Sequence, residues 1–405
     1  MATLDQDRTI GQRVREIRAW RGMSLSAVAE LAGMTPGHLS NIEHGRRRVD
    51  KRSTLEAIAA ALRVAPSELA EQPFPSGDRL ASETHAGIAA VETALTDYEL
   101  GEASDLPLRS WPEIATDLSK LNDEIRPKAD YLTQSLAVPR LIAELHAVHD
   151  GDPQNRRHAL EGLMHVYHAA AVLTKNQGTK GLPQLAAFHA RRVAEELEEP
   201  QWLGHAAWLK TFAAGSSGRS RQYEISQRAA SDLEPHMDLP EVQQVYGMLH
   251  LNSALGSAAQ RKEDEARAHL DEASSVADRL PDDVNKFGYL YFGRTNVSIW
   301  RVSLGTELGD GGKVAEVAKG VRPEDIPSAA RQAMYYADLG RALANDRRTR
   351  GQAVHALAKA ETIAPQRIRN HPFVRETVTD LVRRAKEDAV GRELRGMAYR
   401  MGIAP

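Results

Sequence analysis

Two short helical patterns joined by a glycine turn, between residues 24 and 45, constrain this chain more than any other feature. Ser24 and Thr35 each stand directly before an apolar helical pattern, where a hydroxyl group can cap the first turn. Pro36 follows at the first helical position, where its missing N–H costs nothing. Gly33 closes the first pattern and allows a tight turn. The spacing predicts two short helices that cross at this turn.

Apolar positions at helical spacing predict how these two helices pack. Leu39 and Ile42 of the second helix are expected to lie on Val28 and Leu31 of the first. The other side chains of the second helix then face outward, namely Pro36, Gly37, His38, Ser40, Asn41 and His44. A basic loop follows, with a single Asp50 among Arg46, Arg47, Arg48, Lys51 and Arg52. A basic loop in an otherwise slightly acidic chain indicates contact with an anionic partner at one end only.

Three further helices complete a predicted five-helix unit over the first 70 or so residues. One is expected from about Thr9 to Trp20, and a short one follows Pro66. The remaining helix is expected to begin at Ser53, which forms an S-x-x-E capping box with Glu56.

The run Leu-Ser-x-Ile-Glu-x-Gly at 39–45 and the helix TLEAIAAAL at 54–62 extend this pattern. Together with the glycine turn they resemble the phage-repressor-like (XRE-type) helix-turn-helix family over residues 9–70. The resemblance implies that duplex DNA is a partner and that the second helix enters the major groove by its N-terminal end. It also implies that Arg18 pairs with Glu43 and holds that helix in register as scaffold.

His38 and Asn41 lie one turn apart on the outward face, so both can reach base edges. The predicted base contacts are Gly37, His38, Ser40 and Asn41. By the same resemblance, phosphate contacts come from Ser24, Thr35, Arg46, Arg47, Arg48, Lys51 and Arg52. Phosphate contacts position a protein without reading sequence. Because Pro36 and Gly37 offer little hydrogen bonding, the base-reading set is thin.

The composition excludes several classes of protein. The 405 residues contain no cysteine, which excludes disulfides, thiolate catalysis and cysteine-based zinc sites and favours a cytoplasmic protein. No apolar run approaches the roughly 20 residues of a bilayer span, and the first residues do not form an export signal. Because GxSxG, Walker, GxGxxG and HExxH motifs are absent, we expect no enzyme, no cofactor and no metal.

Residues 72–80 hold two prolines, a serine and a glycine, which predicts a linker. The predicted domains are therefore 1–71 and 81–405, moving semi-independently. In the second domain, helical pairs are predicted whose first helices start near 157, 201, 241, 285, 328 and 372. This period of about 40–44 residues predicts an all-α fold in which about six helix pairs stack as an α-solenoid.

The pair at 336–365 carries the clearest repeat signal. It matches the tetratricopeptide pattern at Tyr336, Leu339, Gly340, Leu343, Ala353, Leu357, Ala360 and Pro365. Ala266, Leu270 and Ala273 repeat the second-helix part of that pattern. HEAT-like pairs remain an alternative because the period exceeds the usual 34 or so residues; the match favours a tetratricopeptide-like array.

First helices line the concave surface of such an array, where peptides usually bind. Asn252 and Asn296 are one period apart, and further steps back reach Lys210 and His168. We predict these four as effector-binding residues because an amide offers a peptide both a donor and an acceptor; ordinary capped or solvent-facing positions are the alternative. A nearby aromatic cluster favours inter-repeat core over a ligand site, and comprises Tyr289, Tyr291, Phe292 and Trp300.

A repressor-type head fused to such an array resembles the peptide-sensing regulators of Gram-positive bacteria. The resemblance implies a cytoplasmic transcriptional regulator that binds operator DNA as a homodimer, since one recognition helix reads too few bases alone. The array is expected to dimerise and to sense a peptide or small effector. Two alternatives stay open. An interaction scaffold would retain a stoichiometric protein partner, and a ligand-independent regulator would bind its operator equally well in any cell extract.

Overall fold

The computed structural model describes residues 9–70, 79–101, 109–214, 218–385 and 391–403. The described residues are almost entirely helical, and one isolated antiparallel bridge joins Asn285 to Phe292. The all-α fold predicted from the sequence is thereby confirmed. None of the helices in these ranges has the length and apolar character that a bilayer crossing requires. The predicted linker at 72–80 lies mostly outside the described residues.

Residues 9–70, called the head below, form the five predicted helices. They are α1 (Ile10–Trp20), α2 (Leu25–Leu31), α3 (Pro36–Glu43), α4 (Arg52–Leu62) and α5 (Pro66–Leu69). Gly33 has a φ of 64° in the turn between α2 and α3, a conformation that favours glycine. The head packs around an apolar core distinct from the main core of the remaining chain, which contributes one side chain to it, Phe373.

Two local expectations for the head were wrong. Leu31 is 65% exposed, and α2 instead buries Val28 and Ala29, with Ala32 directly after it, in the core of the head. The capping box at Ser53 does not form, because α4 already begins at Arg52 and has no side-chain cap of its own. Glu56 instead accepts a hydrogen bond from the backbone of Arg219, 3.2 Å away in the second part of the chain.

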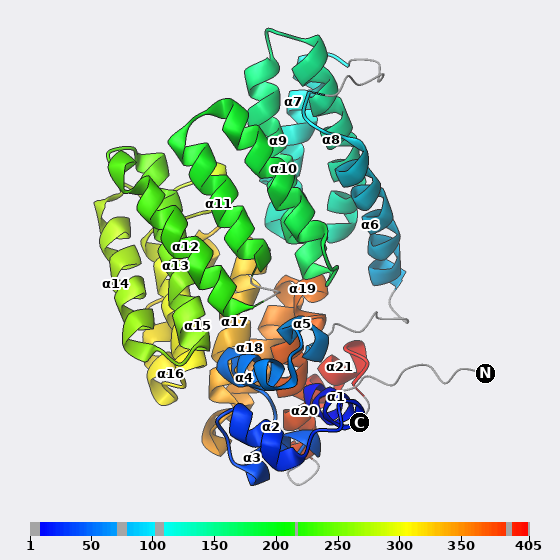
Figure 1. The fold of residues 1–405 in the computed structure, drawn as a ribbon, viewed down its shortest axis with the longest axis vertical. Helices are drawn as coiled ribbons and strands as arrows, with labels where there is room; N and C mark the ends of the chain where they lie inside the picture. The colour runs from blue at the N-terminus through cyan, green and yellow to red at the C-terminus, as the bar shows by residue number, and fades with distance from the viewer. Residues whose placement is uncertain (1–8, 71–78, 102–108, 215–217, 386–390, 404–405) are drawn as a thin grey trace, which may run out of the picture.

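Residues 79–403, called the array below, consist of stacked helix pairs (Figure 1). The first helices are α6 (Arg79–Asp97), α9 (Arg156–Asn176), α11 (Pro200–Ala214), α13 (Pro240–Ala259), α15 (Arg294–Leu308) and α17 (Ala329–Leu343). Their partners are α8 (Tyr131–Gly151), α10 (Leu182–Leu197), α12 (Arg219–Leu233), α14 (Glu263–Arg279), α16 (Gly312–Ala318) and α18 (Arg350–Ile363). The chain also contains α7 (Trp111–Lys120), α19 (Pro365–Arg369), α20 (Pro372–Ala385) and α21 (Arg392–Arg400).

Short segments of other helix types connect these elements. A π-helical turn spans Leu121–Ile125, and 3₁₀ turns span Arg126–Lys128, Glu234–His236, Phe287–Tyr289, Pro323–Asp325 and Arg347–Thr349. The helix expected from 285 starts at Arg294 instead, because Gly288, Tyr289, Tyr291 and Gly293 all have positive φ and cannot continue a helix. The first helices expected from 157, 201, 241 and 328 are α9, α11, α13 and α17, and each begins within a residue of its expected position. The helix expected from 372 is α20, which follows the six pairs.

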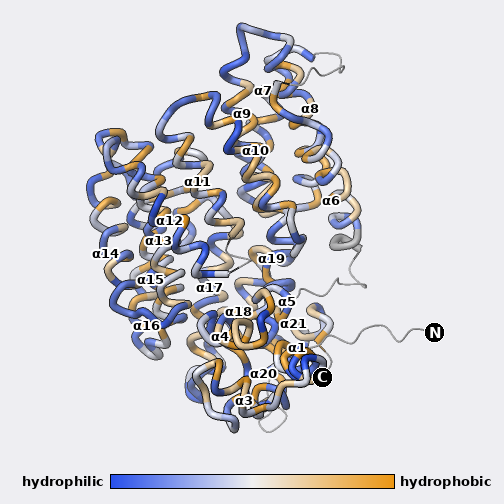
Figure 2. The backbone as a smooth tube through the Cα atoms, viewed as in Figure 1, coloured by the Kyte–Doolittle hydropathy of each residue, from blue (hydrophilic) through white to orange (hydrophobic). Residues whose placement is uncertain are grey.

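The repeat read from the sequence at 336–365 corresponds to α17 and α18. A Cβ atom on Gly340 would lie 2.7 Å from Leu357 Cγ, so only glycine allows these two helices to approach this closely. Ala353, Leu357 and Ala360 are fully buried between them. In Figure 2 hydrophilic and hydrophobic residues alternate along the helices of the array, as expected for amphipathic helices that pack in layers.

Candidate nucleic-acid interface and cavity

Helix α3 is fixed to the head by its caps and by one buried ion pair. Thr35 Oγ1 accepts a hydrogen bond from His38 N at 3.2 Å and thereby caps α3. The guanidinium of Arg18 on α1 donates to both carboxylate oxygens of Glu43, at 2.6 and 2.8 Å. Glu43 is only 3% exposed, so this pair ties the C-terminal end of α3 to α1. The opposite face of α3 is left open.

The open face of α3 carries the residues predicted to contact bases. Gly37 and Asn41 are exposed, and His38 and Ser40 are half-buried. Burial, followed by the charge of Arg47, lowers the pKa of His38, so its imidazole is neutral near pH 7 and has one N–H to donate. Base contact by these four residues stays a prediction.

The residues predicted to contact phosphate do not share one environment. Ser24, Thr35, Arg46 and Arg47 are exposed at the surface of the head. Arg48 is 8% exposed and lies between the head and the array. Its guanidinium donates to Asn345 Oδ1 at 2.8 Å and lies 3.4 Å from Asp380 Oδ2. In this conformation Arg48 has no free face for a phosphate.

Lys51 and Arg52 are also held by the array. Lys51 Nζ donates to the carbonyl of Leu308 at 3.1 Å, and Arg52 forms an ion pair with Glu307 through its side chain. Glu307 also accepts from the backbone N–H of Arg52 at 2.8 Å, so a carboxylate of the array caps the head helix α4. Three of the five cations of the basic loop are therefore bound internally in this conformation, a docking that the local sequence pattern did not predict.

Glu307 is the centre of this docking interface. Besides Arg52, it accepts from Arg341 Nη2 at 2.8 Å, and Arg341 in turn donates to the backbone carbonyl of Asp50 at 2.6 Å. Phe373 of α20 enters the core of the head, with Arg52 and Arg341 lying 5.3 and 4.8 Å from its ring centre. A second array carboxylate, Glu376, accepts from Ile10 N at the start of α1 at 2.9 Å.

The docking interface is expected to weaken in acid. Burial alone would raise the pKa of Glu307, but Arg52 and Arg341 lower this pKa from 4.5 to about 2. A carboxyl group with a lowered pKa contributes its full stability above its ordinary pKa and loses it as the pH falls toward the lowered one. The difference in thermal stability between the native protein and Glu307→Gln is therefore expected to be constant above pH 4.5 and to narrow below it. A difference that widened in acid would contradict this charge state.

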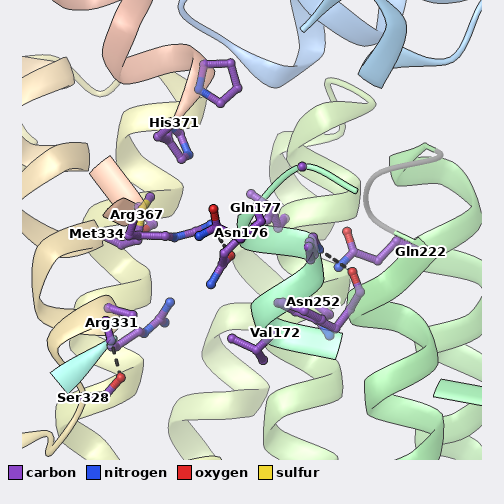
Figure 3. Close-up of a pocket in the computed structure, with 18 of the residues that line it drawn as sticks. Val172, Asn176, Gln177, Gln222, Asn252, Ser328, Arg331, Met334, Arg367 and His371 are labelled. Carbon is purple, nitrogen blue, oxygen red and sulfur yellow. Dashed lines mark hydrogen bonds between the residues drawn. The ribbon is translucent and has the colours of Figure 1, made fainter. Parts of the chain in front are cut away.

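A cavity of about 970 Å³ lies where the head meets the array. Arg52, Leu55 and Glu56 of α4 line it from the head. The array contributes the inner faces of its first helices, and Figure 3 shows Arg331, Met334 and Arg367 approaching from one side and Asn176, Gln222 and Asn252 from the other.

Of the four predicted effector-binding residues, the structure brings His168, Asn252 and Asn296 to this cavity. Lys210 is exposed and does not line it. The reason is helical geometry, because α11 turns Trp208 and Phe212 into the cavity and Lys210 lies between them on the opposite face. Asn296 does not offer its amide to the open space, since it donates to Tyr291 O at 3.0 Å and accepts from Arg331 at 2.9 Å.

Sequence reasoning missed most of the polar lining of the cavity. Tyr289, Tyr291 and Trp300 line the open space, whereas the prediction favoured inter-repeat core for them; Phe292 alone is fully buried core. Five half-buried cations also line it, namely Arg126, Lys175, Arg219, Arg331 and Arg367. They come from different helices at unrelated spacings, so no periodic signal could have found them.

Comparison with protein families identifies the head. A family model described as a helix-turn-helix domain matches residues 9–72. The chain is 33% identical over 92 residues to the uncharacterized HTH-type transcriptional regulator RghRB of Bacillus subtilis, covering 21% of this chain and 66% of that protein. It is 30% identical over 98 residues to the HTH-type transcriptional repressor RghR of the same organism, covering 24% and 69%. The chain thus spans about two thirds of the length of these curated relatives.

Two solved structures are similar over a longer range. Bacillus thuringiensis PlcR, in complex with the peptide PapR7 and DNA, is 11% identical with a TM-score of 0.25, covering 67% of this chain and 94% of PlcR. ComR from S. thermophilus, in complex with DNA and its signalling peptide ComS, is 13% identical with a TM-score of 0.33, covering 87% and 99%.

Proposed function

We propose, from the premise that this chain belongs to the helix-turn-helix family of transcriptional regulators, that it regulates transcription by binding operator DNA through α3. The observation that carries the proposal is the open face of α3, where Gly37 and Asn41 are exposed beside Arg46 and Arg47. A helix held by a buried pair on one side and open on the other suits insertion into the major groove. The role is regulatory rather than enzymatic, and it places the protein with DNA in the cytoplasm.

The DNA-bound form is proposed to be a homodimer. The base-reading set of one α3 is small, and Gly37 has no side chain to donate or accept a hydrogen bond. Two half-sites about one helical turn apart supply the specificity that a single short helix lacks. The array is the part of the chain long enough to hold two heads at that separation.

The cavity is proposed to bind a peptide or small effector that controls the head. Support comes from its position, since Arg52 and Glu56 of the head and Asn252 and His168 of the array line one open space. An effector there contacts both parts, so it has different affinities for the docked and the released head. Such a difference is what a ligand needs in order to shift the balance between two states.

Replacing Arg46 and Arg47 together with alanine is expected to weaken operator binding roughly tenfold. The slope of log affinity against log salt concentration is expected to fall by the amount that about two phosphate contacts contribute. Both side chains are exposed, so their removal leaves the docking interface intact. The measurement is fluorescence anisotropy with fragments of the promoter of the protein's own gene at several salt concentrations. The matched control replaces Arg192 and Arg228, two exposed arginines of the array, with alanine. An unchanged salt slope in the Arg46 and Arg47 variant would remove the phosphate contacts from the proposal.

A further inference from the structure

The five half-buried cations that the array contributes to the cavity differ from other arginines of the protein, including Arg52 on the head side of the same cavity, in what they are bonded to. Arg18, Arg48, Arg52 and Arg341 each pair with a carboxylate. Among the described residues, no carboxylate oxygen lies within ion-pair distance of Arg126, Lys175, Arg219, Arg331 or Arg367. The protein therefore pairs its cations with carboxylates at the docking interface, whereas these five cations of the cavity have no carboxylate in direct contact, although Glu56 and Asp338 also line the cavity.

Neutral oxygens hold these cations in place instead. Arg331 Nε donates to Asn296 Oδ1 at 2.9 Å, and Arg126 Nη1 donates to Asn122 Oδ1 at 2.6 Å. The remaining partners are Asn176 Oδ1 for Arg367, Gln222 Oε1 for Arg219 and the carbonyl of Phe212 for Lys175. An amide oxygen orients a guanidinium without cancelling its charge. The arrangement is that of preorganised cations with donor capacity still open.

The cations lie close enough together to repel one another. Burial is the main cause that lowers the pKa of Arg331 to about 10; the charge of Asp338 opposes this shift and the charge of Arg367 adds to it. Burial also places the pKa of Lys175 well below its ordinary value, and Arg219, Arg367 and Arg52 add to that effect. The lining also has hydrogen-bond donors that a ligand could satisfy. Arg331 Nη2 and the indole nitrogens of Trp208 and Trp300 are buried without a partner among the described residues. Trp208 is only 6% exposed in this lining.

We propose that the cavity binds a ligand with at least two acidic groups, which pair directly with its cations. One acidic group is proposed to pair with Arg331 and Arg367, which lie on the same side of the cavity in Figure 3, and another with Lys175 and Arg219. The inference rests on the proposed effector role of the same cavity and specifies its chemistry. At about 970 Å³ the cavity reaches the upper end of the range of roughly 300–1,000 Å³ typical of small-ligand sites. Trp208, Phe212 and Trp300 add aromatic rings to the lining, and Lys175 and Arg331 lie over the rings of Phe212 and Trp300 at 3.8 and 4.6 Å. Carboxylates of a short acidic peptide and phosphates of a metabolite share this chemistry.

The test uses the full chain without DNA and two probes, a penta-glutamate peptide and inorganic pyrophosphate. Penta-glutamine and sodium chloride of equal ionic strength are the neutral and ionic controls. We expect at least one acidic probe to raise the melting temperature above both controls and to give saturable binding by calorimetry, because binding to the native state stabilises it. A response to pyrophosphate alone assigns the acidic groups to phosphates, and a response to penta-glutamate alone assigns them to carboxylates. No response to either probe overturns the proposal.

Variants distinguish the cavity from the basic loop. Arg331→Gln and Arg367→Gln each keep an amide donor for the neighbouring asparagine and are expected to weaken probe binding at least roughly tenfold. Because neither arginine is in direct contact with a carboxylate, neither substitution is expected to lower the melting temperature of the free protein. The double variant Arg46→Ala, Arg47→Ala removes two exposed cations and is expected to keep the probe response.

The opposite pattern overturns the proposal. A probe response that is lost in the Arg46 and Arg47 variant but kept in both glutamine variants assigns the binding to the basic loop. A glutamine variant that melts well below the native protein assigns a structural role to its arginine. Because these measurements contain no DNA, their failure leaves operator binding by α3 untouched, and a failure of operator binding leaves the probe result untouched.

Discussion

Replacing Glu307 with alanine is expected to lower the free energy of unfolding of the full chain by about 3–5 kcal/mol. Its carboxylate lies between Arg52 and Arg341 and caps the N-terminus of α4, and its side chain is 2% exposed. Alanine leaves two buried guanidinium groups without their shared counter-charge, and removing one partner of a buried network costs far more than the network gains. Denaturation by urea, followed by circular dichroism, measures the change.

The same substitution is expected to release the head and thereby to strengthen operator binding, since Arg52 and Lys51 are no longer held by the array. The control is Glu263→Ala on α14, where the side chain is 57% exposed and pairs with Arg267. An exposed ion pair contributes at most about 1 kcal/mol, so this control should unfold almost like the native protein. Equal losses in the two variants would contradict a central role for Glu307 in docking.

Replacing Gly11 with alanine is expected to destabilise the head by about 1–3 kcal/mol and to weaken operator binding at the same time. Gly11 lies where α1 crosses α3, and a Cβ atom there would stand 2.0 Å from the backbone oxygen of Ile42. A backbone atom cannot rotate away as a side chain can, so α1 and α3 must separate. That separation disturbs the Arg18–Glu43 pair, which holds α3 in register.

The matched control is Gly351→Ala in α18, where an added Cβ atom meets nothing within 4 Å. The same change in open helical space is expected to stabilise the protein by up to about 1 kcal/mol, because alanine favours helix more than glycine does. Thermal melts and anisotropy titrations of both variants test the pair of predictions. A Gly11 variant that melts and binds like the Gly351 variant would show that the crossing of α1 and α3 tolerates a side chain.

The parts of the molecule that the sequence predicted are those set by local chemistry. Thr35 and Ser24 cap their helices through backbone groups three residues away, and Gly33 provides its own turn. Gly340 and Leu357 signal a helix pair because both lie within one repeat. These interactions are encoded within a few turns of helix, so periodicity and composition are enough to find them.

The parts that the sequence did not predict depend on residues distant along the chain. Arg52 meets Glu307, and Ile10 meets Glu376 across 366 positions, with no pattern to connect them. Asn296 was expected to bind a ligand because of its period, yet its amide holds Arg331 in place. A period identifies a shared helix face but does not say which atoms on that face are already used by neighbours.

The capping of α4 by Glu307 makes docking and DNA contact competitors within one polypeptide. Asp380 and Glu307 belong to the same chain and compete with DNA phosphates, Asp380 for Arg48 and Glu307 for Arg52. An intramolecular rival is not diluted when the protein is diluted, so its strength is fixed by the fold and not by cellular abundance. With the phosphate contacts as predicted, docking reduces operator affinity by a constant factor, and the proposed effector would change that factor by adding or removing a few kcal/mol of docking without touching α3.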